Sequence, residues 1–134
     1  HGGTFTGNPV SAIAGAVTLE TLEDGSVHRH IDGLGKMVRD GLNDIFSGSD
    51  LPASVTGVGS LFGVHFMPEP PRSDGDTALS NLDATHAYFN YMLSHGIVYL
   101  SPTMSHSLLS GAHTAEDIEE YLTATEEFLR TYKP

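Results

Sequence analysis

The sequence contains no cysteine, so disulfide bonds and thiolate metal sites are excluded. No apolar run approaches the ~18 residues that a membrane-spanning helix needs, and no signal peptide is recognisable. We therefore expect a cytoplasmic protein that makes no contact with a membrane.

Basic residues are also scarce. Lys and Arg together number 6 against 17 Asp and Glu, which gives a net charge of −11. A balance this acidic disfavours nucleic acids and anionic membranes as partners, because both bind basic surfaces. Any anion site must then rest on local N–H groups, on a helix N-terminus, or on cations supplied from elsewhere. The hydrophobic fraction of 39% over 134 residues indicates a globular fold.

No complete catalytic constellation is present. The sequence has no G-x-S-x-G elbow for a nucleophilic serine. The carboxylate pair Glu119/Glu120 reads as helix surface, and His28 and His30 are two residues apart on a predicted helix, so they cannot share a metal ion. We expect neither catalytic residues nor a metal site within this chain.

The first nine residues have the composition of a binding loop. They include three glycines and two threonines, and they lead into an apolar helical run. Asn8 is a favoured N-cap and Pro9 suits the first helical position. Glycines let backbone N–H groups approach a ligand, and Thr4 and Thr6 add hydroxyl donors, a combination that suits a phosphate. On local chemistry alone, an ordinary glycine-rich loop with a helix cap is the more common explanation of the same residues, because short Gly/Thr motifs often match by chance.

Two helices are predicted in the first third of the chain. Residues 9–22 are apolar on most sides, so we expect this helix to be buried against a partner that the sequence does not contain. Residues 27–46 carry an amphipathic stripe, with Arg39 among the solvent positions. Gly33 and Gly35 lie inside this second helix and weaken it.

The middle of the chain predicts a small sheet. Residues 53–58 and 61–67 read as an antiparallel hairpin, with His65 on the solvent side of the second strand. The proline-containing segment 68–76 is expected to have no regular structure. Residues 97–100 are predicted as a third strand, and 107–109 as a short additional one.

Two further helices complete the prediction. One runs from about Leu82 to just before Gly96. Its expected core residues are Leu82, Phe89, Met92 and Leu93. The other follows a capping box at Thr114–Asp117 and has the cleanest helical stripe in the chain. The predicted fold is α/β, as a small α+β domain with a mainly antiparallel sheet of three or four strands covered by helices.

The run GGTFTGNPVSAIAGAVTLETL resembles a segment of the class III pyridoxal-phosphate (PLP) aminotransferases, and three further motifs of that family follow in order. These are residues 55–63 (V-x-G-x-G-S-L-F-G), residues 92–102 (ending in G-I-V-Y-L-S-P) and residues 110–118 (S-x-A-H-T-x-E-D-I). Four ordered matches are far more specific than any one of them. The most similar branch is that of the glutamate-1-semialdehyde aminomutases.

The resemblance implies the C-terminal part of a fold type I PLP enzyme. Residues 1–25 would form the cofactor-phosphate loop and a connecting helix from the large domain, and 26–134 the small domain. In this family the threonine of the G-T motif reaches the cofactor phosphate of the other subunit in a homodimer. Thr4 has that place here, through its hydroxyl and N–H, and Gly3 shapes the loop. Small amino or keto compounds would be the substrates.

The lysine that forms the Schiff base in this family matches neither Lys36 nor Lys133, so the resemblance places it upstream of His1 and implies that the chain alone is inactive. The absence of arginine between Arg72 and Arg130 favours the aminomutase branch. That branch usually carries a glutamate shortly after an x-P-S motif, where residues 102–106 offer Ser105 or His106 instead.

The reaction therefore stays open among aminomutase, transaminase, racemase and decarboxylase. Two alternatives lie outside this family. One is a stand-alone, non-catalytic binding or interaction domain. The other is an unrelated anion-binding domain that uses the loop from Gly2 to Asn8.

Overall fold

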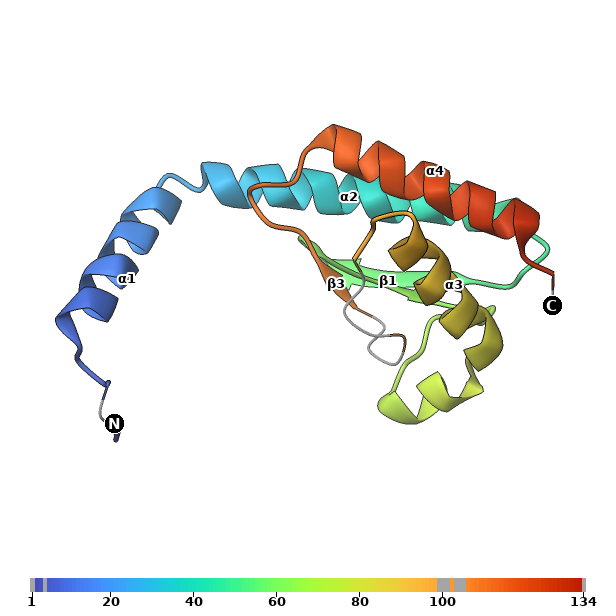
Figure 1. The fold of residues 1–134 in the computed structure, drawn as a ribbon, viewed down its shortest axis with the longest axis horizontal. Coiled ribbons are helices and arrows are strands. Elements are labelled where there is room, and N and C mark those ends of the chain that lie inside the picture. Colours follow the sequence, from blue (N-terminus) through green and yellow to red (C-terminus); the bar gives the residue numbers. More distant parts are fainter. Residues whose placement is uncertain (1, 4, 99–101, 103–105, 134) are drawn as a thin grey trace.

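The computed structural model describes residues 2–3, 5–98, 102 and 106–133 (Figure 1). In chain order the elements are α1 (Pro9–Leu22), α2 (Ser26–Ser47), β1 (Ser54–Val58), β2 (Leu61–His65), the 3-10 helix η1 (Asp74–Leu79), α3 (Leu82–Ser94), β3 (Ser107–Leu108) and α4 (Ala115–Thr131).

The three strands form an antiparallel sheet in the order β1-β2-β3. Val58 pairs with Leu61, so Gly59 and Ser60 make the two-residue turn of the predicted hairpin. Figure 1 shows α2 and α4 side by side across the sheet, and α3 packs against α4. The small α+β domain predicted from the sequence is confirmed.

The two longest helices follow their predicted stripes. α2 buries Leu34, Val38 and Leu42 at helical spacing, and it continues without a break through its glycines. At the start of α4, the Asp117 N–H donates to Thr114 Oγ1 at 3.3 Å and the Thr114 N–H donates to Asp117 Oδ2 at 2.7 Å. This reciprocal pair is the predicted capping box, and it satisfies two backbone donors at the helix end.

The second strand alternates as predicted, but the position of His65 is a correction. Phe62, Val64 and Phe66 are buried in the core. His65 lies on the opposite face, yet it is only 6% exposed and its Nε2 is 2.8 Å from the hydroxyl oxygen of Thr56. The prediction of a solvent-side histidine was wrong because both faces of the sheet are covered at this position. Burial lowers the pKa of His65, since it penalises the charged imidazolium.

This burial predicts a pH dependence of stability. The unfolded chain takes up the His65 proton near pH ~6.5, whereas the folded chain resists protonation to lower pH. The contribution of His65 is therefore complete above that pH and is lost as the pH falls toward the lowered pKa of the folded state. In urea unfolding at a series of pH values, His65→Gln should flatten the decline of the unfolding free energy. His28→Gln serves as the control, because His28 is exposed on α2. If the unfolding free energy declined equally with falling pH in the unsubstituted chain and in both variants, the prediction would be contradicted.

The core face of α3 also differs from the predicted one. Leu82 and Leu93 are 57% and 49% exposed, and Phe89 is half-buried. The buried residues are Ala84, Tyr88 and Met92. The tyrosine occupies the centre of this face because its polar end finds partners. Its O–H donates to the Tyr121 hydroxyl, and the Thr125 hydroxyl lies 2.8 Å away.

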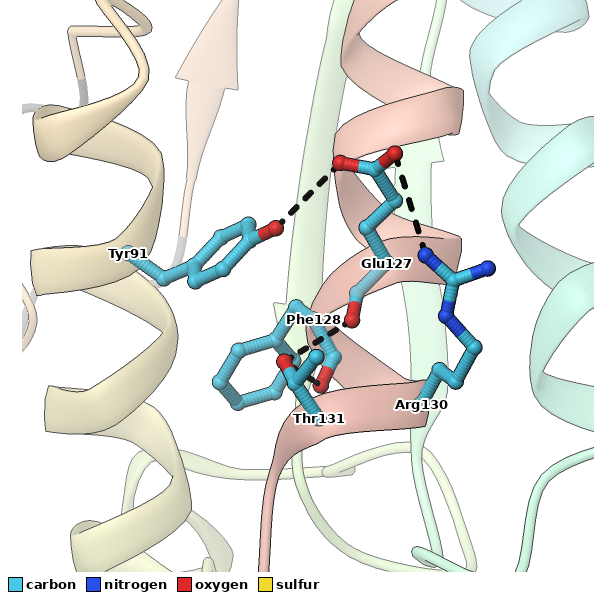
Figure 2. Close-up of polar contacts among 5 residues, drawn as sticks. All are labelled: Tyr91, Glu127, Phe128, Arg130 and Thr131. Carbon is cyan, nitrogen blue, oxygen red and sulfur yellow. Dashed lines mark hydrogen bonds and ion pairs between the residues drawn. The ribbon is translucent and has the colours of Figure 1, made fainter.

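Polar groups also join the outer part of α3 to the end of α4 (Figure 2). The Tyr91 O–H donates to Glu127 Oε2 at 3.4 Å, and Arg130 Nη2 lies 3.9 Å from Glu127 Oε1. Desolvation and the nearby Glu127 carboxylate raise the pKa of Tyr91. The Tyr91 hydroxyl therefore stays protonated and able to donate at neutral pH.

Two predictions between the elements need correction. Ile97 and Val98 belong to no strand, and the other residues of the predicted strand 97–100 lie outside the described residues. The third strand of the sheet is β3, which matches the short additional strand predicted at 107–109. Within the segment 68–76, the 3-10 helix η1 begins at Asp74, because Ser73 and Asp76 form a capping box after the last proline.

α1 has the predicted bounds but no buried residue. It projects away from the sheet and the other helices (Figure 1), with Val10, Ile13 and Leu19 each at least 66% exposed. The described residues of the chain do not cover this apolar helix, which was expected to be buried against a partner outside the sequence.

Candidate functional site: the loop before α1 and the turn of the hairpin

The glycine-rich loop before α1 is built by two tight turns. The Thr6 N–H donates to the Gly3 carbonyl, and the Asn8 N–H donates to the Phe5 carbonyl, each at 3.1 Å. Gly3 has φ +142° and Gly7 has φ +82°, conformations that residues with a Cβ rarely adopt. A Cβ on Gly3 would also lie 3.2 Å from Thr6 Oγ1. This geometry explains why the loop needs glycine at both positions.

The side chain of Asn8 occupies donors at the start of α1. Its Oδ1 accepts from the Val10 N–H at 2.9 Å and from the Ser11 N–H at 3.3 Å. The predicted N-cap is thus confirmed, but it competes with the use of this helix end as an anion site. A ligand anion in this loop must bind to donors other than these two.

The donors left for an anion are few. Thr4, the predicted phosphate-binding residue, lies outside the described residues. The N–H groups of Phe5 and Gly7 have no hydrogen-bond partner among the described residues, and both residues are exposed. No described lysine or arginine lies in this loop. A phosphate placed in this loop would meet these N–H dipoles but no charged side chain of the described loop residues.

A contact that was not predicted from the sequence joins α2 to the turn of the hairpin. Arg39 was expected at a solvent position, but its Nη1 donates to the carbonyls of Gly59 and Leu61. A Cβ on Gly35 would overlap the Gly59 carbonyl oxygen, so α2 and the turn touch through bare backbone. The sequence offered one signal for this contact: Arg39 follows Gly35 by one helical turn, so a long donor side chain lies beside a bare stretch of helix backbone.

A further set of hydrogen bonds surrounds the S-x-A-H-T motif at residues 110–114. The Ser110 N–H donates to His113 Nδ1 at 3.0 Å, and His30 Nε2 donates to the His113 carbonyl at 2.9 Å. Nearby, His106 is exposed immediately before β3, while Ser105 lies outside the described residues. No three histidine, aspartate or glutamate side chains among the described residues gather as a metal ion would require.

The family profile of the class III aminotransferases matches residues 1–125. The chain belongs to this family. It is 38% identical over 131 residues to the glutamate-1-semialdehyde 2,1-aminomutase of Methanothermobacter thermautotrophicus, covering 98% of this chain and 31% of that protein. The aminomutase of Thermus thermophilus is 33% identical over 128 residues, covering 95% of this chain and 30% of that protein.

Solved structures agree with this family. An omega-transaminase from Sphaerobacter thermophilus superposes with a TM-score of 0.82 at 26% identity, over 97% of this chain and 30% of that one. A glutamate-1-semialdehyde-aminomutase from Pseudomonas aeruginosa in complex with PMP gives a TM-score of 0.70 at 26% identity, over 78% of this chain and 23% of that one. The resemblance inferred from the four motifs is confirmed, and the chain spans less than a third of these relatives.

Within the described residues of this class III chain, no helix combines the length and the apolar character that crossing a membrane takes.

Proposed function

We propose that this chain is the C-terminal part of a PLP-dependent enzyme that transfers amino groups of small amino or keto compounds. The preferred reaction is that of a glutamate-1-semialdehyde aminomutase. The observation that carries the proposal is the match over 131 residues to an aminomutase at 38% identity. In this proposal, residues 1–25 belong with the large domain and 26–134 form the small domain. The enzyme would work in the cytoplasm.

The loop before α1 supplies part of the cofactor site in this proposal. Thr4 would hold the phosphate of PLP through its hydroxyl and N–H, and Gly3 would allow the approach of the backbone. PLP, when bound, supplies the electron sink for chemistry at the amino-bearing carbon. The loop brings no cation of its own, which supports a phosphate shared with residues of the large domain and of the partner subunit in a homodimer. The exposed apolar surface of α1 supports the same assembly.

The chain alone would be inactive in this proposal. Lys36 lies on the exposed surface of α2 and forms an ion pair with Asp40, one turn further along. Lys133 follows the last helix and is exposed. Neither sits in the strand-end setting of a Schiff-base lysine, so the proposal places that residue in the large domain.

The omega-transaminase favours a second candidate. Its TM-score of 0.82 exceeds the 0.70 of the aminomutase structure, and it covers more of this chain. An ordinary class III transaminase is therefore the alternative reaction. A stand-alone, non-catalytic domain is the alternative of a different class.

A chimaera separates these three functions. The residues of the Methanothermobacter aminomutase that align with this chain would be replaced by the chain itself. We expect the chimaera to bind PLP and to isomerise glutamate-1-semialdehyde. Amino transfer only to an added keto acid would favour the transaminase. A folded chimaera that binds no PLP would contradict the enzyme proposal and favour the stand-alone domain.

In this chimaera, Thr4→Ala should weaken PLP binding by about 10-fold to 100-fold, because a hydrogen bond to a charged group contributes about 1.5–3 kcal/mol. Thr4→Ser, which keeps the hydroxyl, should retain most of the affinity. Thr18→Ala is the control outside the loop, because the Thr18 hydroxyl donates to the Ala14 carbonyl within α1, and we expect its dissociation constant to change less than about twofold. Fluorescence titration with PLP measures all three. Equal losses for Thr4→Ala and Thr18→Ala would remove Thr4 from the site.

A further inference from the structure

β3 is held in the sheet by few interactions of its own. Among the described residues, two of this strand pair with β2, as Leu61↔Leu108 and Phe62↔Ser107. Beyond them, the Leu109 N–H donates to the Ser60 carbonyl at 3.2 Å. Leu108 is 60% exposed, so its side chain adds little burial. An edge strand this short needs support from the connection that follows it.

That support is a closed pair of hydrogen bonds between Ser110 and His113. The His113 N–H donates to the Ser110 carbonyl at 3.1 Å, and the Ser110 N–H donates back to His113 Nδ1 at 3.0 Å. The Ser110 hydroxyl oxygen is also 3.0 Å from Nδ1. On the other side, His30 Nε2 donates to the His113 carbonyl and joins this connection to α2.

These contacts determine which nitrogen of the neutral His113 ring carries the proton. A backbone N–H can only donate, so Nδ1 must be bare to accept from Ser110, and the ring proton of the neutral form must lie on Nε2. A proton on Nδ1 turns the acceptor into a donor that faces the Ser110 N–H. The bond from the Ser110 N–H is then lost, and the only contact left to Nδ1 among those described is donation to the Ser110 hydroxyl oxygen, 3.0 Å away. His30 behaves differently, because its Nε2–H donates whether its ring is neutral or charged.

We propose that His113 is a pH-sensitive clasp, which holds β3 in the sheet while Nδ1 is bare and releases β3 when Nδ1 is protonated. The proposal does not depend on the enzymatic function.

Titratable groups on two helices lie beside this ring. From α4, Asp117 and Glu120 line a cavity together with His113. A second cavity beside His113 is lined by residues of α2, β2, β3 and α4, and the titratable groups among its described residues are Asp117 and Tyr121. From α2, His30 is the titratable neighbour, and it meets the carbonyl of His113.

The test uses this 134-residue chain and two NMR measurements. Ring ¹⁵N shifts report the tautomer of His113, and amide hydrogen exchange reports the protection factors of Leu109 and Ser110, in which the intrinsic pH dependence of exchange is divided out. We expect a bare Nδ1 near neutral pH. As the His113 ring takes up its proton, both protection factors should fall by roughly fivefold to tenfold, as expected for one lost hydrogen bond.

Variants identify the group responsible. His113→Asn places an amide oxygen where Nδ1 lies, so it should keep the protection near its neutral-pH value and abolish the pH step. His113→Gln and His113→Leu lack an acceptor there and should show low protection at every pH. His30→Gln keeps a donor and should leave the step in place. Protection at the buried Val38 and Ile118 shows that each variant is folded.

Three results would overturn the proposal: a proton on Nδ1 at neutral pH, a pH step that persists in His113→Asn, or equal protection in His113→Asn and His113→Leu.

Discussion

Replacing Phe128 with Ala should lower the free energy of unfolding by about 3–5 kcal/mol, the usual cost of removing a large buried aromatic ring. Phe128 is 3% exposed. Its ring centroid lies 5.1 Å from that of Tyr88 and 6.0 Å from that of Phe66, so it links α3, α4 and the sheet region in one aromatic cluster. Its removal would leave a cavity between three elements, which none of them can fill alone.

Urea unfolding measures this loss as a shift of the midpoint at unchanged slope. Because a domain of this size is stable by only about 5–15 kcal/mol, the variant should be close to the limit of folding. Phe5→Ala is the matched control, because Phe5 is 79% exposed. Its effect should be within about 0.5 kcal/mol. A similar midpoint for both variants would show that the cluster does not form the core.

Gly35→Ala should destabilise the chain by roughly 1–3 kcal/mol, although alanine is the better helix former. The new methyl group would overlap the Gly59 carbonyl oxygen, which is backbone and cannot turn away as a side chain would. Either α2 or the hairpin turn must then move. That movement would also disturb the bonds from Arg39 to the Gly59 and Leu61 carbonyls.

Gly33→Ala gives a control with the opposite sign. Gly33 is in the same helix and is exposed, and a methyl group added there would meet nothing within 4 Å beyond the backbone of its own helix. Its replacement should stabilise the chain by up to about 1 kcal/mol through helix propensity alone. The close contact between α2 and the hairpin turn predicts a urea midpoint below that of the unsubstituted protein for Gly35→Ala and above it for Gly33→Ala. A gain in stability for Gly35→Ala would show that α2 and the turn are not in contact.

The four α-helices, the hairpin and the family could be predicted from the sequence alone. The helix at residues 9–22 and the start of the helix near Leu82 follow from caps and spacing, which are local interactions between neighbours in the chain. The hairpin follows from alternation and a Gly-Ser turn. Four motifs in fixed order identified the class III aminotransferases, and the family match over residues 1–125 confirms it. The predicted role of Thr4 stays a prediction.

How these elements are covered and joined depends on the packing of the folded chain. His65 is buried, Tyr88 lies at the centre of the α3 face, and Arg39 bonds to a turn twenty residues away. Ser107–Leu108 provides the third strand, supported by a histidine whose partners lie on α2 and in the loop before α4. Each of these depends on how elements far apart in the sequence pack together, which side-chain periodicity within one element does not reveal. Side-chain periodicity tells which residues share a face of an element, while the packing of other elements decides whether that face meets solvent, core or a hydrogen-bond partner.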